Sequence, residues 1–535
     1  MTDAIQKAAK ALAQLSDAVL CDAEFSENAV TNHPNTVDDP PPQIQQAQKP
    51  TEGSQFLPIV AKPTERREHK LTRVAFAISR LMEFCSEKEL VNQTGHNVEY
   101  WPLVILKELF DNALDAAEES EIPPEIEIIV AKDGTITITD NANGIAAETI
   151  KAILDYTIRV SSREAYVSPT RGAQGNALKT ILAMSYVIDR ESDFSEVVND
   201  EAVGITLIET RGELHRIEFK VDHVNSQPKL NHTVTPCTFR RGTRITVKWP
   251  TGRKQQRENW LLLSERPFKQ LAEAYVWFNP HLTLRGVWHG KEFINVKATN
   301  PTWEKWRPCN PTSAHWYNED RLQHYMAAHV ARDRDLKRER SVRDFLPEFR
   351  GLSGTIVRRK ILTEIGCSHQ SLAQFFGVDQ VNRKGIAKLL RAMCKHSKPV
   401  QPKHLGVIGR EHLKTRFLAA GGNIETFKYE LETGYTEDGI PFVIEVAFGL
   451  HQTGLTWGPS SSFVTRKFVA GVNWSVAINN PFRTFGRTGQ GLENMLAELR
   501  VNDREPVICA VHLASAYVRY TDRGKSAIVL NGEDR

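Results

Sequence analysis

The chain reads ELFDNALDA over residues 108–116, and this is the first of three motifs that decide its fold. DNANGI follows at residues 140–145 and RGAQGNALK at residues 171–179. Each motif alone is weak evidence, since short segments with carboxylates or glycines often match by chance. Together, in this order and this close in the chain, they carry more weight than any one of them alone.

The first motif lies within residues 101–119, where apolar residues recur at three- and four-residue spacing and predict an amphipathic helix. Four polar residues stand at positions i, i+3, i+4 and i+7, are expected on one neighbouring face and are assigned to the nucleotide site: Glu108, Asp111, Asn112 and Asp115. The amide oxygen of Asn112 suits Mg²⁺, which keeps several waters and needs few protein ligands. The carboxylate of Glu108 can orient and deprotonate an attacking water. Taken alone, the same pattern is more often a solvated acidic helix face.

The second motif follows two β-rich segments, residues 126–130 and 135–139, which predict a hairpin around the turn at Gly134. The hairpin would deliver Asp140 to the end of its second strand. A carboxylate there can accept a hydrogen bond from an exocyclic amine, which distinguishes adenine from guanine. Gly144 would let the backbone approach the base. The alternative interpretation of Asp140 is an Asx turn at a strand end, which is common for such a sequence.

The third motif places glycines before the apolar residues that begin a helix near residue 178. Backbone N–H groups are exposed at such a helix start, where the dipole favours an anion, so Gly172 and Gly175 predict a phosphate loop. The rest of the motif is assigned to the same nucleotide contact: Arg171, Asn176, Ala177 and Lys179. A solvated helix lysine is an equally good interpretation of Lys179.

The composition is that of a globular protein with ample core: 535 residues, 41% hydrophobic and 25% charged. This length predicts about two to four domains. No apolar run approaches the ~18 residues of a membrane span, and the N-terminus lacks a basic-then-apolar signal pattern. We therefore expect an intracellular protein without a membrane segment. The 7 cysteines are scattered and odd in number, which fits reduced thiols better than a disulfide framework.

The net charge is only +3, but positive charge is concentrated between residues 331 and 400. This stretch holds 16 Lys and Arg against 7 Asp and Glu. Solvated helix faces explain much of such charge, yet a local excess of this size also favours a polyanion such as DNA. The clusters inside the stretch are the candidate DNA contacts: Arg358, Arg359, Lys360, Arg383 and Lys384.

Changes in pattern divide the chain into four expected parts. Residues 1–66 pass through a proline run and a glutamine-rich run, which predict a flexible acidic extension. Residues 67–310 alternate strands with helices, residues 311–405 are helical with glycine turns, and residues 406–535 change to strands. In the last part we expect strands at residues 442–447, 468–478 and 507–520 and a helix at residues 491–499.

The three nucleotide motifs resemble the Bergerat ATP fold, which is shared by DNA gyrase B, heat-shock chaperones, histidine kinases and MutL. The chain departs from the usual pattern where Ala142 and Ala177 stand at positions commonly held by glycine. Thr243, in the segment Arg-Gly-Thr-Arg, resembles the further family residue that closes the adenine pocket through a hydroxyl. Alone, Thr243 indicates only an ordinary strand start.

The downstream half resembles one member of this class, the B subunit of DNA topoisomerase VI. The similar segments are residues 171–179, 278–281, 341–408, 442–449, 471–479, 511–518 and 521–525. By this resemblance the chain is an α+β protein: a Bergerat-type ATPase α/β sandwich, a basic helix-two-turns-helix insert and a C-terminal transducer domain. In that family the lysine of the last loop reaches the γ-phosphate from the transducer, and Lys525 takes this place here. The alternative is an exposed loop lysine.

The resemblance implies an ATPase that uses Mg²⁺ and closes as a homodimer around double-stranded DNA when ATP binds. The tyrosine that cleaves DNA belongs to the A subunit in that family, so this chain is not expected to cut DNA by itself. A partner that resembles the A subunit of topoisomerase VI and a cytoplasmic, nucleoid-associated location are expected. The family continues into a long helix that grips the A subunit, whereas this chain ends ten residues after Lys525. Either that contact is made differently, or the partner is another protein.

Two other functions stay open from the sequence. One is a non-catalytic nucleotide-binding scaffold of a DNA-processing complex, which only Ala142 and Ala177 support. Four residues together argue instead for activity, because an inactive site has no chemical need for them: Glu108, Asn112, Asp140 and Lys525. The other function is that of a MutL-like repair ATPase, but MutL lacks the basic helical insert.

Overall fold

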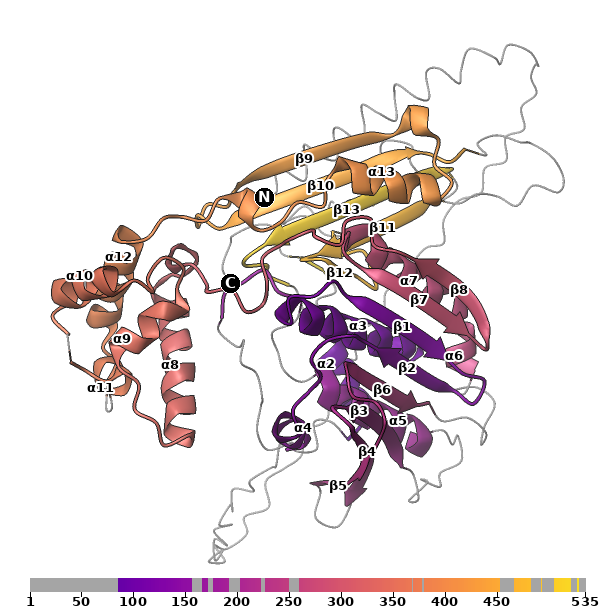
Figure 1. Cartoon of the computed structure of the whole chain (residues 1–535), viewed down its shortest axis with the longest axis horizontal. Helices are drawn as coiled ribbons and strands as arrows, with labels where there is room; N and C mark the ends of the chain where they lie inside the picture. Colours follow the sequence, from indigo (N-terminus) through magenta and orange to yellow (C-terminus); the bar gives the residue numbers. More distant parts are fainter. Residues whose placement is uncertain are drawn as a thin grey trace, which may run out of the picture.

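The computed structural model describes residues 85–155, 166–171, 177–191, 203–222, 227–249, 259–367, 369–377, 380–452, 466–482, 492, 505–520 and 527–528. Two sheets and a separate group of helices are distinct within them (Figure 1). The mixture of strands and helices confirms the predicted α+β class. The predicted extension at residues 1–66, and the predicted helix at residues 491–499 apart from Leu492, lie outside the described residues.

The first sheet has eight strands in the order β5-β4-β3-β6-β2-β1-β7-β8. The strands are β1 Glu125–Val130, β2 Thr135–Thr139, β3 Gly204–Thr210, β4 Glu213–Asp222, β5 Gln227–Pro236, β6 Thr243–Lys248, β7 Thr283–Trp288 and β8 Lys291–Val296. β1 and β2 form the expected antiparallel hairpin, and β1 pairs with β7 in parallel. Because side chains alternate along a strand, β1 buries Ile126, Ile128 and Val130 on one face.

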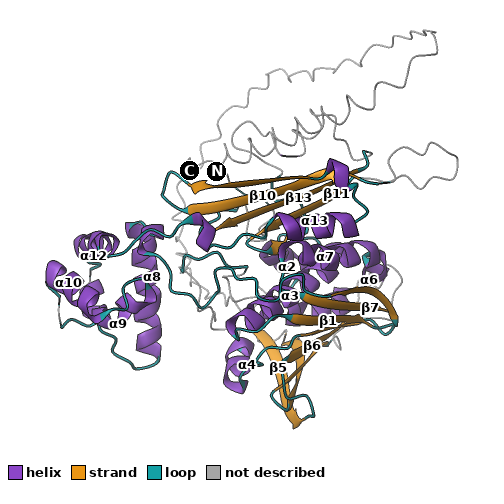
Figure 2. Cartoon of the chain, turned by 45° about the horizontal axis from the view of Figure 1, so that its top comes forward, coloured by secondary structure: helices purple, strands orange, loops and turns teal. Residues whose placement is uncertain are grey.

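Helices cover one face of this sheet and separate it from the second sheet (Figure 2). They are α2 Glu87–Thr94, α3 Trp101–Glu119, α4 Ala147–Leu154, α5 Ala177–Glu191, α6 Asn259–Leu263 and α7 Glu265–Phe278. The bounds of α3 are those that its apolar periodicity predicts. α3 contacts β1 and β2 below it, α5 and α7 beside it, and strand β12 of the second sheet. The rings of Phe110 and Tyr275 stack with centroids 4.1 Å apart and join α3 to α7.

The helical group stands to one side of both sheets (Figure 1). It comprises α8 Glu319–Asp335, α9 Val342–Phe345, α10 Thr355–Ile365, α11 Leu372–Phe376 and α12 Arg383–Lys395. An aromatic cluster fills its centre, where Tyr325, Phe345 and Phe349 meet edge to face or tilted. Ser371 begins α11 with a capping box, and Gly366 ends α10 in the left-handed conformation.

The chain enters and leaves this helical group at one place. The backbone N–H of Trp306, before the group, donates to the carbonyl oxygen of Leu405, after it, at 2.7 Å. The indole Nε1–H of Trp303 donates to the carbonyl oxygen of Val407, also at 2.7 Å. The two connecting segments therefore run side by side.

The second sheet has five strands in the order β12-β11-β13-β10-β9. The strands are β9 Lys428–Tyr435, β10 Pro441–Leu450, β11 Lys467–Val472, β12 Ser475–Val476 and β13 Val507–Ser515. β10 and β13 are buried along nearly their whole length. Helix α13 (Arg410–Ala419) packs against β10 and α7 between the two sheets (Figure 2). Short 3-10 helices complete the described backbone: Val98–Tyr100, Ala314–Trp316, Leu346–Glu348, Pro402–His404 and Ile424–Thr426.

Three expectations about the C-terminal part are wrong. The strand expected at residues 507–520 ends earlier, because β13 covers Val507–Ser515. Residues 468–478 do not form one strand, because Asn473 and Trp474 turn the chain between β11 and β12. The turn is hidden in the pattern because no glycine or proline marks it. The part after residue 406 also begins with a helix, α13, rather than with strands.

Candidate nucleotide site

Helix α3 divides its four polar residues between two environments. Asn112 is exposed and Glu108 half-buried, whereas Asp111 and Asp115 are buried. The first pair lies one helical turn apart on the solvent-accessible side of the helix, and its contact with a nucleotide stays a prediction. The second pair is turned toward other parts of the protein, as described below. The four residues therefore share one half of the helix but not one role.

Asp140 lies just beyond the end of β2 and is tied to β6. Its Oδ1 accepts from the backbone N–H of Ala142 at 2.9 Å and from that of Thr243 at 3.1 Å. The backbone N–H of Asp140 in turn donates to the carbonyl oxygen of Thr243 at 2.9 Å. The predicted Asx turn is thus present, and the same carboxylate also joins two neighbouring strands. Asp140 and Thr243, which are 103 residues apart, are thus in direct contact, and their contact with a nucleotide stays a prediction.

Burial dominates the electrostatics of Asp140. The loss of solvent raises its pKa to about 6, although hydrogen bonds from Ala142 and Thr243 act in the opposite direction. A carboxyl group with this pKa changes charge just below neutral pH. Its power to accept a hydrogen bond from an amine therefore depends on pH in that range.

Gly144 is required by its surroundings. Its φ is +76°, and a Cβ at this position would lie 2.4 Å from Oγ1 of Thr210 on β3. The same hydroxyl accepts from the backbone N–H of Ile145 at 3.0 Å and donates to the carbonyl oxygen of Gly242 at 3.1 Å. The absent side chain therefore lets the loop after Asp140 pack against β3, a reason that the sequence alone does not reveal.

The third motif is described only in part. Gly172, Gly175 and Asn176 lie outside the described residues, as does Lys525. Ala177 is the half-buried first residue of α5. Lys179 is buried, and its Nζ donates to the carbonyl oxygen of Asp155 at 2.6 Å. The interpretation of Lys179 as a solvated helix lysine is therefore wrong, and burial lowers its pKa.

Arg171, at the start of the third motif, is held in a buried network. Its Nη1 lies 2.8 Å from Oδ1 of Asp115, and both of its terminal nitrogens bond to the carboxylate of Glu118 at 2.8 Å. Its Nη2 also donates to Oδ1 of Asn279 at 2.6 Å. These partners give Arg171 and Asp115 a structural role, and their contact with a nucleotide stays a prediction.

Glu118 is the centre of this network. Lys305 Nζ approaches its Oε2 at 2.6 Å, and Nε2 of His281 approaches its Oε1 at 3.1 Å. Burial alone would raise the pKa of Glu118, but the charges of Arg171 and Lys305 outweigh it and hold that pKa well below its usual range. Burial, aided by the charge of Arg171, lowers the pKa of Lys305 to about 8.

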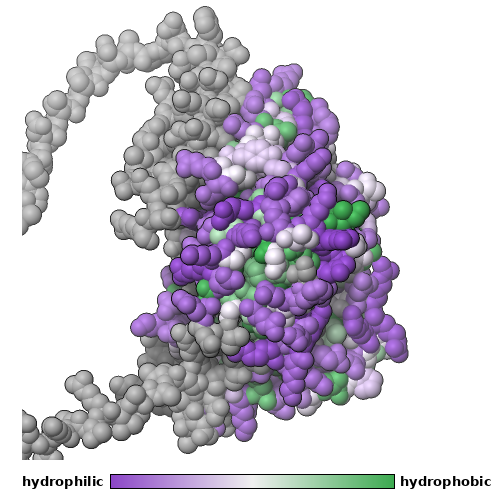
Figure 3. All heavy atoms as spheres, turned by 90° about the vertical axis from the view of Figure 1, so that its left-hand side faces the viewer, coloured by the Kyte–Doolittle hydropathy of each residue, from purple (hydrophilic) through white to green (hydrophobic). Residues whose placement is uncertain are grey.

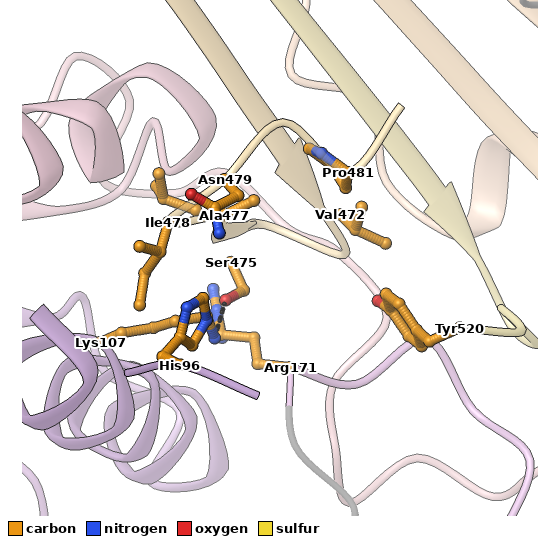
Figure 4. A pocket seen from close by; sticks show the side chains of 11 residues that line it. His96, Lys107, Arg171, Val472, Ser475, Ala477, Ile478, Asn479, Pro481 and Tyr520 are labelled. Atoms are coloured by element: carbon orange, nitrogen blue, oxygen red, sulfur yellow. Dashed lines mark hydrogen bonds between the residues drawn. The ribbon is translucent and has the colours of Figure 1, made fainter. Parts of the chain in front are cut away.

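Asp111 belongs to a second polar cluster, next to the first. Its Oδ2 accepts from Nζ of Lys107 and from Oγ of Ser475, both at 2.7 Å, and its Oδ1 accepts from the hydroxyl of Tyr275 at 2.8 Å. A cavity of about 30 Å³ adjoins the cluster, lined by side chains that Figure 4 labels, among them Tyr520. This cavity has room for little more than one water.

Sequence reasoning missed the partners that hold α3 in place. Lys107 and Asp111 form an i, i+4 pair, which is a signal that could have been read from the sequence. Glu118, Tyr275 and Ser475 carry no such local signal, since their partners come from distant segments. The two clusters join the predicted nucleotide helix to the second sheet.

The candidate DNA contacts lie on the helical group. Arg359 and Lys360 are exposed on α10, Arg358 is half-buried beside them, and Arg383 and Lys384 are exposed at the start of α12. Further exposed cations follow on α12 at helical spacing from residue 384: Lys388, Arg391 and Lys395. Figure 3 shows this side of the molecule as mostly hydrophilic, with a small hydrophobic area near its middle. The structure thus places these cations where a polyanion could reach them.

The described residues contain neither a membrane-spanning helix nor a clustered metal site. None of the described helices is both long and apolar enough to cross a membrane. Three or more His, Cys, Asp or Glu side chains do not come together as a metal site anywhere in the described ranges. A single amide ligand such as Asn112 needs no such cluster.

Two known proteins with sequences similar to this chain carry the same name. No family model matches the chain. It is 22% identical to the B subunit of type 2 DNA topoisomerase 6 from Metallosphaera sedula over 457 residues, which cover 79% of this chain and 74% of that protein. The protein of the same name from Natronomonas pharaonis is 30% identical over 152 residues, covering 27% of this chain and 17% of its own.

Solved structures give weaker likenesses. The ATPase region of topoisomerase II from Saccharomyces cerevisiae matches with 11% identity and a TM-score of 0.33, over 80% of this chain and 76% of that one. The Aquifex aeolicus MutL ATPase domain complexed with ADP matches with 11% identity and a TM-score of 0.29, over 76% of this chain and 90% of that one.

Proposed function

We propose that this chain, whose resemblance to the B subunit of topoisomerase VI extends over most of its length, binds and hydrolyses ATP within a larger complex. In this proposal it dimerises on ATP, clamps duplex DNA and drives a partner that resembles the A subunit of topoisomerase VI. The observation that carries the nucleotide site is Asp140, a buried carboxylate at a strand end whose loop packs closely through Gly144.

The roles proposed for Glu108 and Asn112 on α3 follow from the exposure of their side chains to solvent. Glu108 is half-buried one turn before the exposed Asn112, so both side chains can reach a phosphate chain beside the helix. Glu108 orients the attacking water and accepts its proton. Asn112 fits as the single protein ligand of Mg²⁺, an ion that neutralises phosphate charge when bound.

Base recognition is assigned to Asp140 and Thr243. When ionised, Asp140 accepts from the exocyclic amine of adenine, and its position is held by two backbone N–H groups. Ala142 replaces a common glycine, but its side chain is buried without disturbing these bonds. This accommodation weakens the case for a non-catalytic scaffold. The phosphate roles of Gly172, Gly175 and Lys525 stay part of the proposal.

The partner roles rest on charge and on the resemblance. The exposed cations of α10 and α12 form a surface that suits the phosphates of double-stranded DNA. DNA cleavage is assigned to the partner protein, so this chain alone should leave supercoiled DNA intact.

The proposal is tested by the solution mass of the purified protein with a non-hydrolysable ATP analogue, with ADP and without nucleotide. A dimer that appears only with the triphosphate, and not in Asp140→Ala, supports an ATP-gated clamp. Binding of the analogue is measured in the same samples. A wild-type protein that does not bind the analogue contradicts the nucleotide site itself, and one that binds it but stays monomeric with DNA present contradicts the clamp.

A further inference from the structure

The turn between β11 and β12 has an unusual backbone. Val472 pairs with Ser475, so two residues, Asn473 and Trp474, make the whole turn. Both have positive φ, 51° and 63°, as the hairpin turn that matches strand twist requires. Asn tolerates this conformation, but a bulky residue such as Trp rarely adopts it, and such strain persists only where the surroundings enforce it. Trp474 is fully buried.

On one side, the turn is bonded to β13 of the second sheet. The backbone N–H of Trp474 donates to Nε2 of His512 at 3.0 Å. Oδ1 of Asn473 accepts from the backbone N–H of Ser515 at 2.9 Å, and the backbone N–H of Asn473 donates to the carbonyl oxygen of Leu513 at 2.8 Å. These bonds make the turn move with β13.

On the other side, Trp474 is bonded to the first cluster around Glu118. The carbonyl oxygen of Trp474 accepts from Nδ2 of Asn279 at 3.0 Å and from Nε of Arg171 at 3.4 Å. Nζ of Lys305 lies 4.5 Å from the centre of the Trp474 ring, within reach of a cation–π contact. The peptide groups on both sides of Trp474 are therefore held by different parts of the fold.

The next residue, Ser475, is bonded to α3. Its hydroxyl donates to Oδ2 of Asp111 at 2.7 Å and accepts from Nζ of Lys107 at 2.9 Å. Figure 4 shows Lys107 and Ser475 facing each other across the gap between α3 and the second sheet. Lys107 directly precedes the proposed base Glu108, and Arg171 directly precedes the proposed phosphate loop.

We infer that the segment Asn473–Ser475 is a coupling element, which transmits the nucleotide state of α3 and of Arg171 to the second sheet. The inference rests on the proposed function, since it assumes a nucleotide beside α3. Any shift of α3 or of the start of the phosphate loop acts on a turn whose other bonds lead to β13. Ser475 and Trp474 are positioning residues in this account, because they act through α3 and Arg171 rather than on the nucleotide. Packed, hydrogen-bonded contacts of this kind change between discrete arrangements rather than yielding gradually.

Hydrogen exchange of the second sheet tests the inference. Amide exchange in β10 and β13 is compared with and without a non-hydrolysable ATP analogue, in wild type and in Ser475→Ala. We expect the analogue to change exchange in wild type, and the two proteins are compared at saturating analogue because a coupling contact also alters affinity. In Ser475→Ala this nucleotide effect should fall about tenfold, since the variant loses bonds to two charged groups.

Two further variants separate coupling from mere stability. Ser515→Ala is the matched control, because it removes only a buried hydroxyl that donates to the carbonyl oxygens of Pro441 and Tyr517. The variant keeps the backbone N–H that bonds Asn473 and leaves α3 untouched. It should keep the nucleotide effect at the wild-type size. Ser475→Thr keeps a hydroxyl and should restore most of the effect.

Three results would overturn the inference. An equal nucleotide effect in wild type and Ser475→Ala removes the role of this turn. Bound analogue with no change of exchange in the wild-type sheet removes the coupling itself. If Ser515→Ala loses as much of the nucleotide effect on exchange as Ser475→Ala does, the loss reflects a general decrease in stability. Failure of the wild-type protein to bind the analogue is distinguishable from all three, because it contradicts the proposed function first.

Discussion

Glu118 and Arg171 face each other in a buried, bidentate ion pair, with Oε1 2.8 Å from Nη2 and Oε2 2.8 Å from Nη1. The exposed fractions of their side chains are 4% and 0%. Lys305 shares the same carboxylate. Neither charge can return to water while the protein is folded, so each depends on the other.

The first prediction concerns the stability that this pair protects. Glu118→Gln leaves Arg171 and Lys305 buried without their common counter-charge, and breaking a buried pair from one side costs about 3–5 kcal/mol. Denaturant unfolding should show this loss. The matched control is Glu209→Gln, which removes a half-exposed partner of Arg244 and should stay within about 1 kcal/mol of wild type. Equal losses in the two variants would contradict the special position of Glu118.

The second prediction concerns the pH dependence of nucleotide binding. Because the pKa of Asp140 is raised to about 6, the carboxylate form that accepts the adenine amine is lost below that pH. Affinity for an ATP analogue should fall roughly tenfold between pH 7 and pH 5. Asp140→Asn, whose amide oxygen accepts at every pH, should lack this component, while titration of the phosphates affects both proteins alike. Identical pH profiles for the two proteins would contradict the assignment.

The third prediction concerns the free energy of unfolding, which should depend on pH because the pKa of Asp140 is raised. The folded state holds the proton of Asp140 more tightly than the unfolded chain, whose Asp titrates near pH 4. The contribution of this group to stability is therefore fully present below about pH 4 and is lost as pH rises through about 6. Unfolding free energies of wild type and Asp140→Asn, measured from pH 4 to pH 8, should diverge in that window. Parallel curves would show that the pKa is not shifted.

The fourth prediction concerns hydrolysis. Glu108→Ala should lower the rate of phosphate release by about 10²–10⁴, the usual contribution of a general base, while the affinity for the ATP analogue stays unchanged. Glu119→Ala is the control, because Glu119 is exposed at the end of the same helix. Wild-type turnover in Glu108→Ala would mean that another group activates the water.

The fifth prediction concerns DNA. Binding of a short duplex should weaken steeply with salt, and Lys384→Ala and Arg391→Ala should each reduce the slope of log K against log salt by about 0.9 for every phosphate that the variant no longer neutralises. Fluorescence anisotropy across a salt series measures this slope. Lys132→Ala is the control. Lys132 is exposed in the turn after β1, outside the helical group, so the variant removes an equal charge and should leave the slope unchanged. A flat salt dependence in wild type would argue against this surface.

Local periodicity was enough to predict the elements that carry the candidate site. α3 has its predicted bounds, and the hairpin before Asp140 is formed, because side-chain spacing reports burial directly. The break between β11 and β12 could not be predicted, since Trp474 in a left-handed turn is stabilised by tertiary contacts. No local rule connects Lys107 with Ser475, which are 368 residues apart in the sequence. The direction in which Asp115 turns was hidden for the same reason, whereas the i, i+4 spacing of Lys107 and Asp111 was a readable signal.

The hydrogen bond from Trp306 to Leu405 has a consequence for how the chain is built. It closes the whole helical group into a loop whose two ends touch. The entropy of closing a loop grows only slowly with its length. In topological terms the helices that carry the basic surface are an insertion whose two connecting segments lie side by side. The insertion is also tied to the second sheet, because Arg321 of α8 bonds to Asp438 between β9 and β10. A change in the length of the helical segment therefore costs little loop entropy, provided that this contact is kept.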